Sequence, residues 1–159
     1  MQPENVNENT VLWEPSQEVV EKANITAYMR WLKQKKGLAF NTYTELWQWS
    51  VDDIEAFWKS LWEFYEIKTS TPFGQVLPER KMPRADWFSG ARLNYTEHVF
   101  RNMSNKRPAL IFQSELQPLT EISWKDLYGQ VSAVAAGLRR LGVQRDDRVV
   151  SLMPNIPQT

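Results

Sequence analysis

The segment that most constrains the fold is a short apolar run near the C-terminal end of the sequence. Residues 147–155 read Asp-Arg-Val-Val-Ser-Leu-Met-Pro-Asn, with the apolar side chains between a charged residue and a proline. This pattern predicts a strand that is buried on both faces, as in a parallel α/β sheet. Such a strand needs neighbouring strands, and the sequence runs only to Thr159. We therefore expect it to open a larger domain, with any catalytic residues beyond Thr159.

Two further strands are predicted upstream of this run. Residues 109–112 (Ala-Leu-Ile-Phe) and 119–122 (Leu-Thr-Glu-Ile) are short apolar segments separated by polar and turn-forming residues. Paired segments of this kind are typical of a β-hairpin.

A helix is predicted over residues 124–141, directly after the hairpin. Ser123 and Asp126 have the spacing of a capping box at its start. Gly142 can end the helix in the left-handed conformation, with Val143 against Leu138 in a Schellman arrangement. Strand, strand, helix and strand in this order predict the opening of a layered α/β domain.

The region before the hairpin is predicted to be rich in helices. A short helix should follow Ser16, and a second should have Asn24 as its N-cap and Gly37 at its end. Thr42 and Glu45 form a capping-box pair for a third.

The strongest helical pattern follows Ser50, which forms a second capping-box pair with Asp53. Apolar residues then recur at three- and four-residue spacing and predict one wide buried face. They are Ile54, Phe57, Trp58, Leu61, Trp62 and Tyr65. Because no basic residues alternate with Trp58, Trp62 and Tyr65, we interpret them as core and not as a base-stacking surface.

Two segments without regular apolar spacing divide the remaining sequence. Residues 69–88 carry several prolines and no period, so we expect an extended connection there. Asn94 should cap a short helix, and the polar residues 102–106 should form a linker. We therefore predict two parts, a helical N-terminal extension over 1–105 and the start of an α/β domain over 106–159.

Composition excludes several classes of function. The 19 basic and 19 acidic residues give a net charge of zero, which argues against nonspecific binding to nucleic acid or a membrane surface. The absence of cysteine excludes disulfides and thiolate chemistry. The N-terminal residues are polar, and no apolar run has membrane-spanning length, so we expect a cytoplasmic protein.

No group of residues has the pattern of a catalytic, cofactor or metal site. His98 is the one histidine in the sequence and has no serine or aspartate beside it. The pairs Asp52–Asp53 and Asp146–Asp147 are better explained by a helix start and by a turn than by metal binding. Glycine-rich nucleotide motifs are also missing. We therefore predict no catalytic, cofactor-binding or metal-binding residue in this chain.

Several segments nevertheless resemble one enzyme family. Residues 46–58 (Leu-Trp-Gln-Trp-Ser-Val-Asp-Asp-Ile-Glu-Ala-Phe-Trp) and 82–98, which contain Trp-Phe-Ser-Gly-Ala-Arg-Leu-Asn-Tyr-Thr-Glu-His, are similar to the N-terminal region of adenylate-forming acyl-CoA synthetases. The motif within residues 82–98 resembles the acetoacetyl-CoA branch of this family more than its acetate branch. Residues 13–15 fit the same family, and residues 120–127 and 148–155 resemble the start of its AMP-binding domain.

The resemblance implies an acid–thiol ligase that activates acetoacetate with ATP as an acyl-adenylate and then passes the acyl group to coenzyme A. It implies ATP, Mg²⁺ and coenzyme A as substrates or cofactors of the whole enzyme. The family's nucleotide loop and mobile lysine would lie beyond this sequence, so we expect an inactive N-terminal fragment whose partner is the remainder of the ligase.

Two alternatives remain open at this level. The chain could be a free-standing interaction module from a truncated paralogue, which would bind a partner through the apolar surface that the rest of the domain would cover. It could also belong to a ligase for another short-chain acid, such as acetate or propionate.

Overall fold

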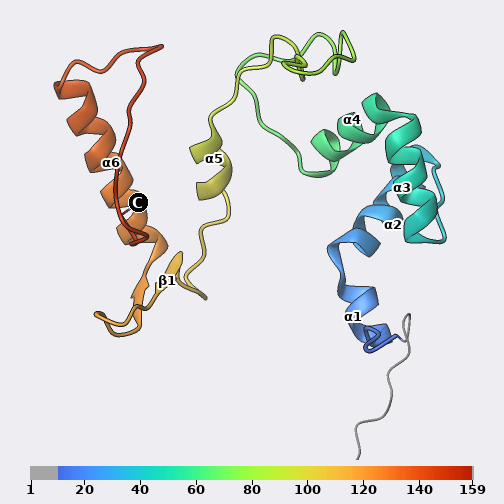
Figure 1. The fold of residues 1–159 in the computed structure, drawn as a ribbon, viewed down its shortest axis with the longest axis horizontal. Coiled ribbons are helices and arrows are strands. Elements are labelled where there is room, and N and C mark those ends of the chain that lie inside the picture. Colours follow the sequence, from blue (N-terminus) through green and yellow to red (C-terminus); the bar gives the residue numbers. More distant parts are fainter. Residues whose placement is uncertain (1–10, 159) are drawn as a thin grey trace, which may run out of the picture. The chain divides into compact units, whose positions relative to one another are not determined.

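The structure is a computed structural model that describes residues 11–158. These residues form two compact units, divided between Arg92 and Leu93 (Figure 1). The first unit contains helices and an irregular loop, and the second contains two helices and a β-hairpin. This order confirms the predicted fold class of a helix-rich region followed by α/β elements. Within residues 11–158, every helix is too short or too polar to cross a lipid bilayer.

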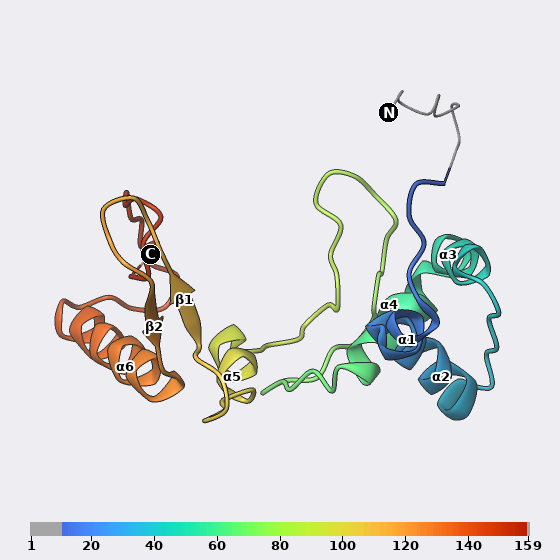
Figure 2. The same cartoon turned by 90° about the horizontal axis from the view of Figure 1, so that it is seen from below.

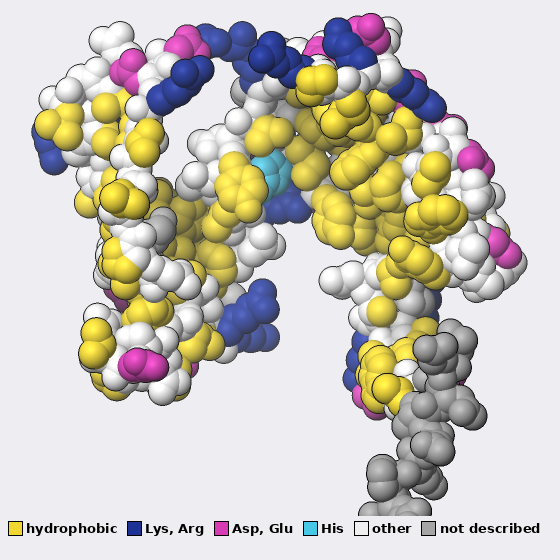
Figure 3. Space-filling model, viewed as in Figure 1, with side chains coloured by type: hydrophobic (Ala, Val, Ile, Leu, Met, Phe, Trp, Pro, Cys, Tyr) yellow, Lys and Arg dark blue, Asp and Glu magenta, His cyan; other side chains and the backbone are white. Residues whose placement is uncertain are grey.

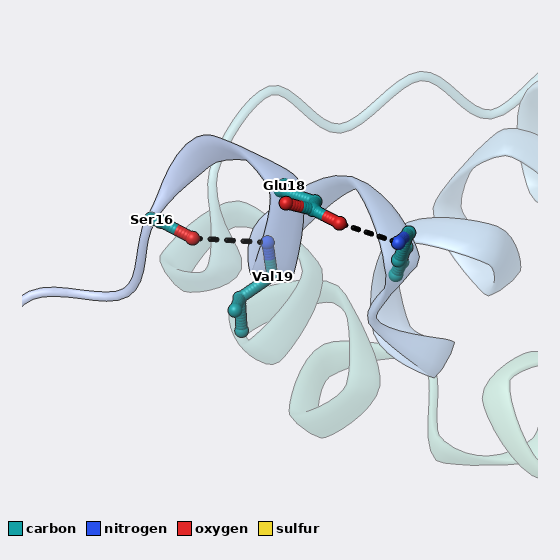
Figure 4. Close-up of polar contacts among 4 residues, drawn as sticks. Ser16, Glu18 and Val19 are labelled. Atoms are coloured by element: carbon teal, nitrogen blue, oxygen red, sulfur yellow. Dashed lines mark hydrogen bonds and ion pairs between the residues drawn. The ribbon is translucent and has the colours of Figure 1, made fainter.

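The first helix, α1 (Gln17–Lys22), begins where the sequence predicts. Ser16 has an extended backbone, and its Oγ accepts a hydrogen bond from the Val19 N–H at 3.4 Å (Figure 4). Lys22 and Glu18 lie one turn apart, with 2.6 Å between Nζ and Oε1. Because this ion pair is exposed, we expect it to add little stability.

Helix α2 (Asn24–Lys36) ends as predicted but begins differently. Its N-cap is Ala23, which has the extended backbone of a cap and no capping side chain, so the prediction of Asn24 as the cap is wrong. Helix α1 ends at Lys22, and Ala23 alone makes the turn between the two helices. At the other end, Gly37 has a φ of 70°, and its N–H donates to the Leu32 carbonyl.

Helix α3 (Tyr43–Asp52) starts at the predicted cap. The Thr42 Oγ1 accepts a hydrogen bond from the Glu45 N–H at 3.2 Å. The Glu45 carboxylate accepts in turn from the Asn41 N–H at 2.6 Å, one residue before the cap.

Helix α4 (Ile54–Phe64) begins after Asp53, so the prediction of Ser50 as its N-cap is wrong. Ser50 lies inside α3, and its Oγ donates to the Trp47 carbonyl at 2.7 Å. The cap is Asp53, whose Oδ1 accepts from the Ala56 N–H at 3.1 Å. The prediction fails because α3 continues through Ser50, where a mid-helix serine bonds back to its own helix.

The core of the first unit lies between α2, α3 and α4. Tyr28, Leu32 and Leu46 are buried, and residues of α4 pack against them. Those residues are Phe57, Leu61 and Phe64. Apolar side chains also gather on the surface of this unit (Figure 3).

The second apolar side of α4 is only partly buried. Trp62 is half-buried, whereas Trp58 is 41% exposed and Tyr65 is 50% exposed. The prediction that Trp58 and Tyr65 belong to the core is therefore wrong. The apolar arc of α4 is wider than the surface that α2 and α3 cover, so its edge residues stay in contact with solvent.

The second unit begins with α5 (Tyr95–Phe100), which Asn94 caps as predicted. The Asn94 Oδ1 accepts a hydrogen bond from the Thr96 N–H at 3.0 Å. Strands β1 (Leu110–Phe112) and β2 (Thr120–Ile122) follow and pair antiparallel, with Leu110 opposite Ile122 (Figure 2). The predicted hairpin is thus confirmed.

Helix α6 (Trp124–Arg140) starts at its predicted cap and ends one residue before the predicted 141, with Leu141 as the C-cap. The Ser123 Oγ accepts from the Asp126 N–H at 3.1 Å and donates to the Asp126 carboxylate at 2.6 Å. Gly142 has a φ of 87°, and the Val143 N–H donates to the Leu138 carbonyl at 3.1 Å. With the bond from the Gly142 N–H to the Arg139 carbonyl, this is a Schellman motif.

The predicted terminal strand is not formed. Residues 147–155 are neither helix nor strand, and the side chains of Val150 and Leu152 are 89% and 102% exposed. A strand exists only through hydrogen bonds to a neighbour. Within residues 11–158, β1 and β2 pair with each other and no strand pairs with this segment.

The choice between the two possible caps of α4 gives a first prediction. Asp53→Ala should lower the free energy of unfolding by about 1 kcal/mol, because it removes the side-chain acceptor at the N-cap. Ser50→Ala should change it by less than about 0.5 kcal/mol, since Ser50 is a half-buried position inside α3 and a helix interior favours alanine. Urea melts of both variants measure this difference, and a larger loss for Ser50→Ala would contradict the assignment of Asp53.

Candidate functional site

The polar residues that the sequence singles out lie on different elements and have local hydrogen-bond partners. His98 lies on α5, and the Asn102 side-chain amide donates to its backbone carbonyl at 3.1 Å. Asp52 ends α3 and accepts from the Gln48 side chain at 2.9 Å, while Asp53 caps α4.

Asp146 and Asp147 lie in the turn after α6. Asp146 has a φ of 73°, and Asp147 accepts a hydrogen bond from the Gln144 N–H at 2.7 Å. This bond closes the turn, which explains the carboxylate without a ligand. Within the described part of the chain, no three histidine or acidic residues lie close enough to hold a metal ion. The expectation that no residue here is catalytic or ligating stays a prediction.

In the first unit, the most organised region outside the helices is the loop that follows α4 and runs to the end of the unit. Its two arms, residues 70–76 and 88–92, run antiparallel and are held by backbone hydrogen bonds. Arg92 bonds with Ser70 and Thr71, at 2.8 and 3.1 Å, and the Phe88 N–H donates to the Val76 carbonyl at 2.7 Å. The sequence analysis predicts only an extended connection here, because its prolines hide the pairing.

Aromatic rings attach this loop to α4. The Trp62 ring lies 5.2 Å from Phe73 and 4.3 Å from Phe88, measured between centroids. Trp58 lies 5.5 Å from Trp87 in an edge-to-face arrangement. The Trp-Phe motif at residues 87–88 is therefore structural in this unit, because it holds the loop on the second apolar side of α4.

A cavity of about 250 Å³ opens between α2, α3 and α4. Its lining is apolar and aromatic, and none of the lining residues is acidic or basic. They are Asn24, Ile25, Tyr28, Tyr43, Leu46, Trp47, Ser50, Phe57, Leu61 and Tyr65. Such a lining can accept an apolar group. Its hydroxyl groups have no histidine, carboxylate or lysine beside them in the lining that could activate them.

One buried polar pair lies beside this cavity, and the sequence analysis missed it. Ser60 is 3% exposed and Tyr28 is 5% exposed, with 2.5 Å between their hydroxyl oxygens. The Ser60 hydroxyl donates to the Phe57 carbonyl at 2.7 Å, so its single proton is used and the Tyr28 hydroxyl is the donor of the pair. Burial raises the pKa of Tyr28 above its ordinary value of 10.0.

In the second unit, a polar groove lies beside the start of α6. It is lined by residues 104–108, Glu121 and residues 123–126, which carry both signs of charge. The Trp124 Nε1–H is buried here without a hydrogen-bond partner among the described residues. An unpaired buried donor of this kind costs roughly 1–3 kcal/mol, and only the structure reveals it.

Two family models match adjoining parts of the sequence. The acetyl-coenzyme A synthetase N-terminus matches residues 43–99, and the AMP-binding enzyme family matches residues 97–159. In sequence, the chain is thus similar to acetyl-coenzyme A synthetases at their N-terminus and to AMP-binding enzymes in the residues that follow.

Among the similar proteins are acetoacetyl-CoA synthetases from an animal and from a bacterium. Acetoacetyl-CoA synthetase from Macaca fascicularis is 32% identical over 155 residues, which are 96% of this chain and 23% of the relative. The acetoacetyl-coenzyme A synthetase of Rhizobium meliloti (strain 1021) is 32% identical over 148 residues, 93% of this chain and 23% of its own length.

A solved structure supports the same relationship. Acetoacetyl-CoA synthetase from Streptomyces lividans superposes with a TM-score of 0.83 at 40% identity, over 92% of this chain and 23% of the solved one. The chain thus spans about 23% of the length of the relatives that it matches.

The Tyr28–Ser60 pair predicts a pH dependence. The pKa of Tyr28 is raised in the folded state above the ordinary value of 10.0. The folded state therefore holds the proton of the Tyr28 hydroxyl more tightly than the unfolded state does. The contribution to stability is present below pH 10.0 and is lost as the pH rises through the folded-state pKa.

Denaturant melts at about pH 9 and about pH 11 on wild type and Tyr28→Phe measure this contribution. We expect the stability advantage of wild type, about 1 kcal/mol from the hydrogen bond, to shrink at the higher pH. An advantage that grows with pH would contradict the burial of this hydroxyl.

The ring contacts of α4 predict a ranking of three tryptophans. Trp62→Ala should destabilise by about 3 kcal/mol, because its ring packs between two others. Trp58→Ala should cost about 1–2 kcal/mol, since that side chain is part-exposed. Trp13→Ala, at a side chain that is 74% exposed, is the control with little effect. Equal losses for Trp58→Ala and Trp62→Ala in urea melts would disprove the ranking.

Proposed function

We propose that this chain is the N-terminal part of an ATP-dependent ligase that forms acetoacetyl-CoA from acetoacetate, ATP and coenzyme A. The observation that carries the proposal is the match of nearly the whole chain to the first quarter of acetoacetyl-CoA synthetases, with a TM-score of 0.83. We further propose that residues 1–105 are the helical extension, that residues 106–159 begin the AMP-binding domain, and that the ligase acts in the cytoplasm.

The proposed reaction has two steps. The acid carboxylate attacks the α-phosphorus of ATP and releases pyrophosphate, which leaves a mixed anhydride with AMP. The thiol of coenzyme A then attacks the acyl carbon, and AMP leaves. The first step is needed because a carboxylate is a poor acyl donor to a thiol, whereas AMP is a good leaving group.

We assign no magnesium ligand to residues 11–158, in which no three histidine or acidic side chains lie close together. The ligase would take Mg²⁺ with ATP, and we assign its site to the part of the enzyme that follows this region. The same holds for the nucleotide, the acid and coenzyme A. The role of this chain is then structural, through the helices and the loop held on α4.

The test is made on the complete reading frame. The coding DNA is read past the codon for Thr159, the whole product is expressed, and acid-dependent ATP–pyrophosphate exchange is measured. We expect the frame to continue and exchange to be faster with acetoacetate than with acetate or propionate. Residues 1–159 alone should show no exchange.

Each contrary result has a definite meaning. A stop codon directly after Thr159 would overturn the ligase proposal and favour a free-standing interaction module. A preference for acetate or propionate would keep the reaction and change the acid. Exchange by purified residues 1–159 would show that the assignment of the catalytic groups to a later region is wrong.

A further inference from the structure

An open groove of about 390 Å³ lies between α1, α2 and the loop that joins α2 to α3. Its apolar lining comes from these elements and from the first residue of α3. The apolar residues are Val20, Ile25, Met29, Phe40 and Tyr43. Their burial is incomplete, since Ile25 is 40% exposed and Tyr43 is 65% exposed. The groove therefore presents apolar surface to solvent within the first unit.

Two cations and no anion line the same groove. Arg30 and Lys33 are three residues apart on α2, so they lie on one side of that helix. None of the lining residues is acidic. Elsewhere in the first unit, Lys22, Lys36 and Lys81 each pair with a glutamate. Neither Arg30 nor Lys33 has such a partner among residues 11–158, so both charges remain available to a ligand.

Hydrogen bonds at the corner between α1 and α2 hold one wall of the groove. The Thr26 Oγ1 donates to the Val20 carbonyl at 2.6 Å. The Arg30 Nη1 donates to the Glu21 carbonyl at 3.3 Å. A guanidinium carries five N–H donors, so this bond positions the Arg30 side chain and leaves other donors for a ligand.

The loop wall of the groove is held by contacts with α3. The Phe40 ring lies 5.3 Å from the Trp49 ring, between centroids. The Asn41 N–H donates to the Glu45 carboxylate at 2.6 Å, which engages that carboxylate at the start of α3. Glu45 does not line the groove, so the lining keeps its positive charge.

We propose that this groove binds an amphipathic anion, namely a small molecule with one acid head group and an unbranched apolar tail. The head group binds between the Arg30 guanidinium and the Lys33 ammonium, and the tail lies along Ile25, Met29 and Phe40. A purely apolar ligand would leave both charges unpaired, whereas a small inorganic anion would leave the apolar lining in water. The inference goes beyond the proposed ligase and does not rest on it.

Nuclear magnetic resonance of isotope-labelled methionine methyl groups tests the site in the chain of residues 1–159. Met29 lines the groove and is the reporter. Met82, which is 88% exposed and outside the lining, is the matched control signal. The two signals are assigned with Met29→Leu and Met82→Leu. Sodium decanoate should shift the Met29 signal saturably and leave the Met82 signal unchanged, with a Kd of about 1 mM or lower for a ligand of this size.

Three further probes separate the head group from the tail. Decyltrimethylammonium has the same tail and the opposite charge, so it should cause no saturable shift of Met29. Hexanoate has the same head group and a shorter tail, and should bind at least about tenfold more weakly because it buries fewer methylene groups. Decyl phosphate should also bind, and the tighter of decanoate and decyl phosphate identifies the head group as a carboxylate or a phosphate.

Substitutions of the two cations test the charge requirement. Arg30→Gln and Lys33→Gln should each weaken decanoate binding about threefold, since exposed ion pairs contribute modestly, and the double variant about tenfold. Lys35→Gln is the matched control, because Lys35 is also exposed in the last turn of α2 but lies outside the groove. It should bind decanoate like wild type. All three residues are exposed, so thermal melts of the variants should resemble wild type.

A second measurement covers the case in which residues 1–159 do not fold alone. The same titration is then made on the complete product of the reading frame, with acetoacetate present in excess to occupy the proposed substrate site. Decanoate should still shift the Met29 signal, and Arg30→Gln with Lys33→Gln should still weaken it. Binding at Met29 in a product without ligase activity would support the groove and count against the proposed function.

Four results would overturn the inference. They are the absence of a saturable Met29 shift with decanoate and decyl phosphate, equal binding of decyltrimethylammonium, an unchanged affinity in the double variant, and equal weakening by Lys35→Gln and Lys33→Gln. A Met29 signal that changes with protein concentration alone would also contradict it, because a second copy of the chain would then occupy the groove.

Discussion

The first unit depends on a helix that is apolar on two sides. Helix α4 places Phe57, Leu61 and Phe64 against the core formed by α2 and α3. Trp58 and Trp62, each one residue after a core residue, pack against aromatic residues of the loop that follows α4. Because the loop has little regular structure of its own, these ring contacts and the backbone bonds between its arms determine its conformation. The two halves of this unit are thus joined through one helix.

In the second unit, local structure is complete but the apolar side chains of α6 are not buried. Its capping interactions are complete at both ends of α6, and its hairpin is in register, yet α6 contains no buried residue. Local hydrogen bonding is therefore satisfied while apolar burial is not. The buried Trp124 Nε1–H, which has no hydrogen-bond partner among the described residues, is a second interaction that this unit does not make. This combination supports the proposal that these elements belong to a larger AMP-binding domain.

Local signals in the sequence predict local structure well, and fail where long-range packing decides. Thr42, Ser123 and Gly142 act within a few residues of themselves, and the structure confirms each of them. Ser50 and Asp53 are both good caps, and the choice depends on where α3 ends. No spacing rule could pair Tyr28 with Ser60, because they are 32 residues apart. For a functional site the sequence predicts only absences, because glycine-rich nucleotide motifs are missing from residues 1–159.

The two turns after α6 have a consequence for assembly. The Schellman bonds at Gly142 and the bond from the Gln144 N–H to Asp147 are made within the chain itself. They fix the direction in which the backbone leaves the helix before any partner is present. Ordering a residue costs about 1–2 kcal/mol of conformational entropy, and residues 142–147 have already lost much of that freedom. The path by which the chain leaves α6 is thus set by its own hydrogen bonds, before residues 149–153 pack against anything.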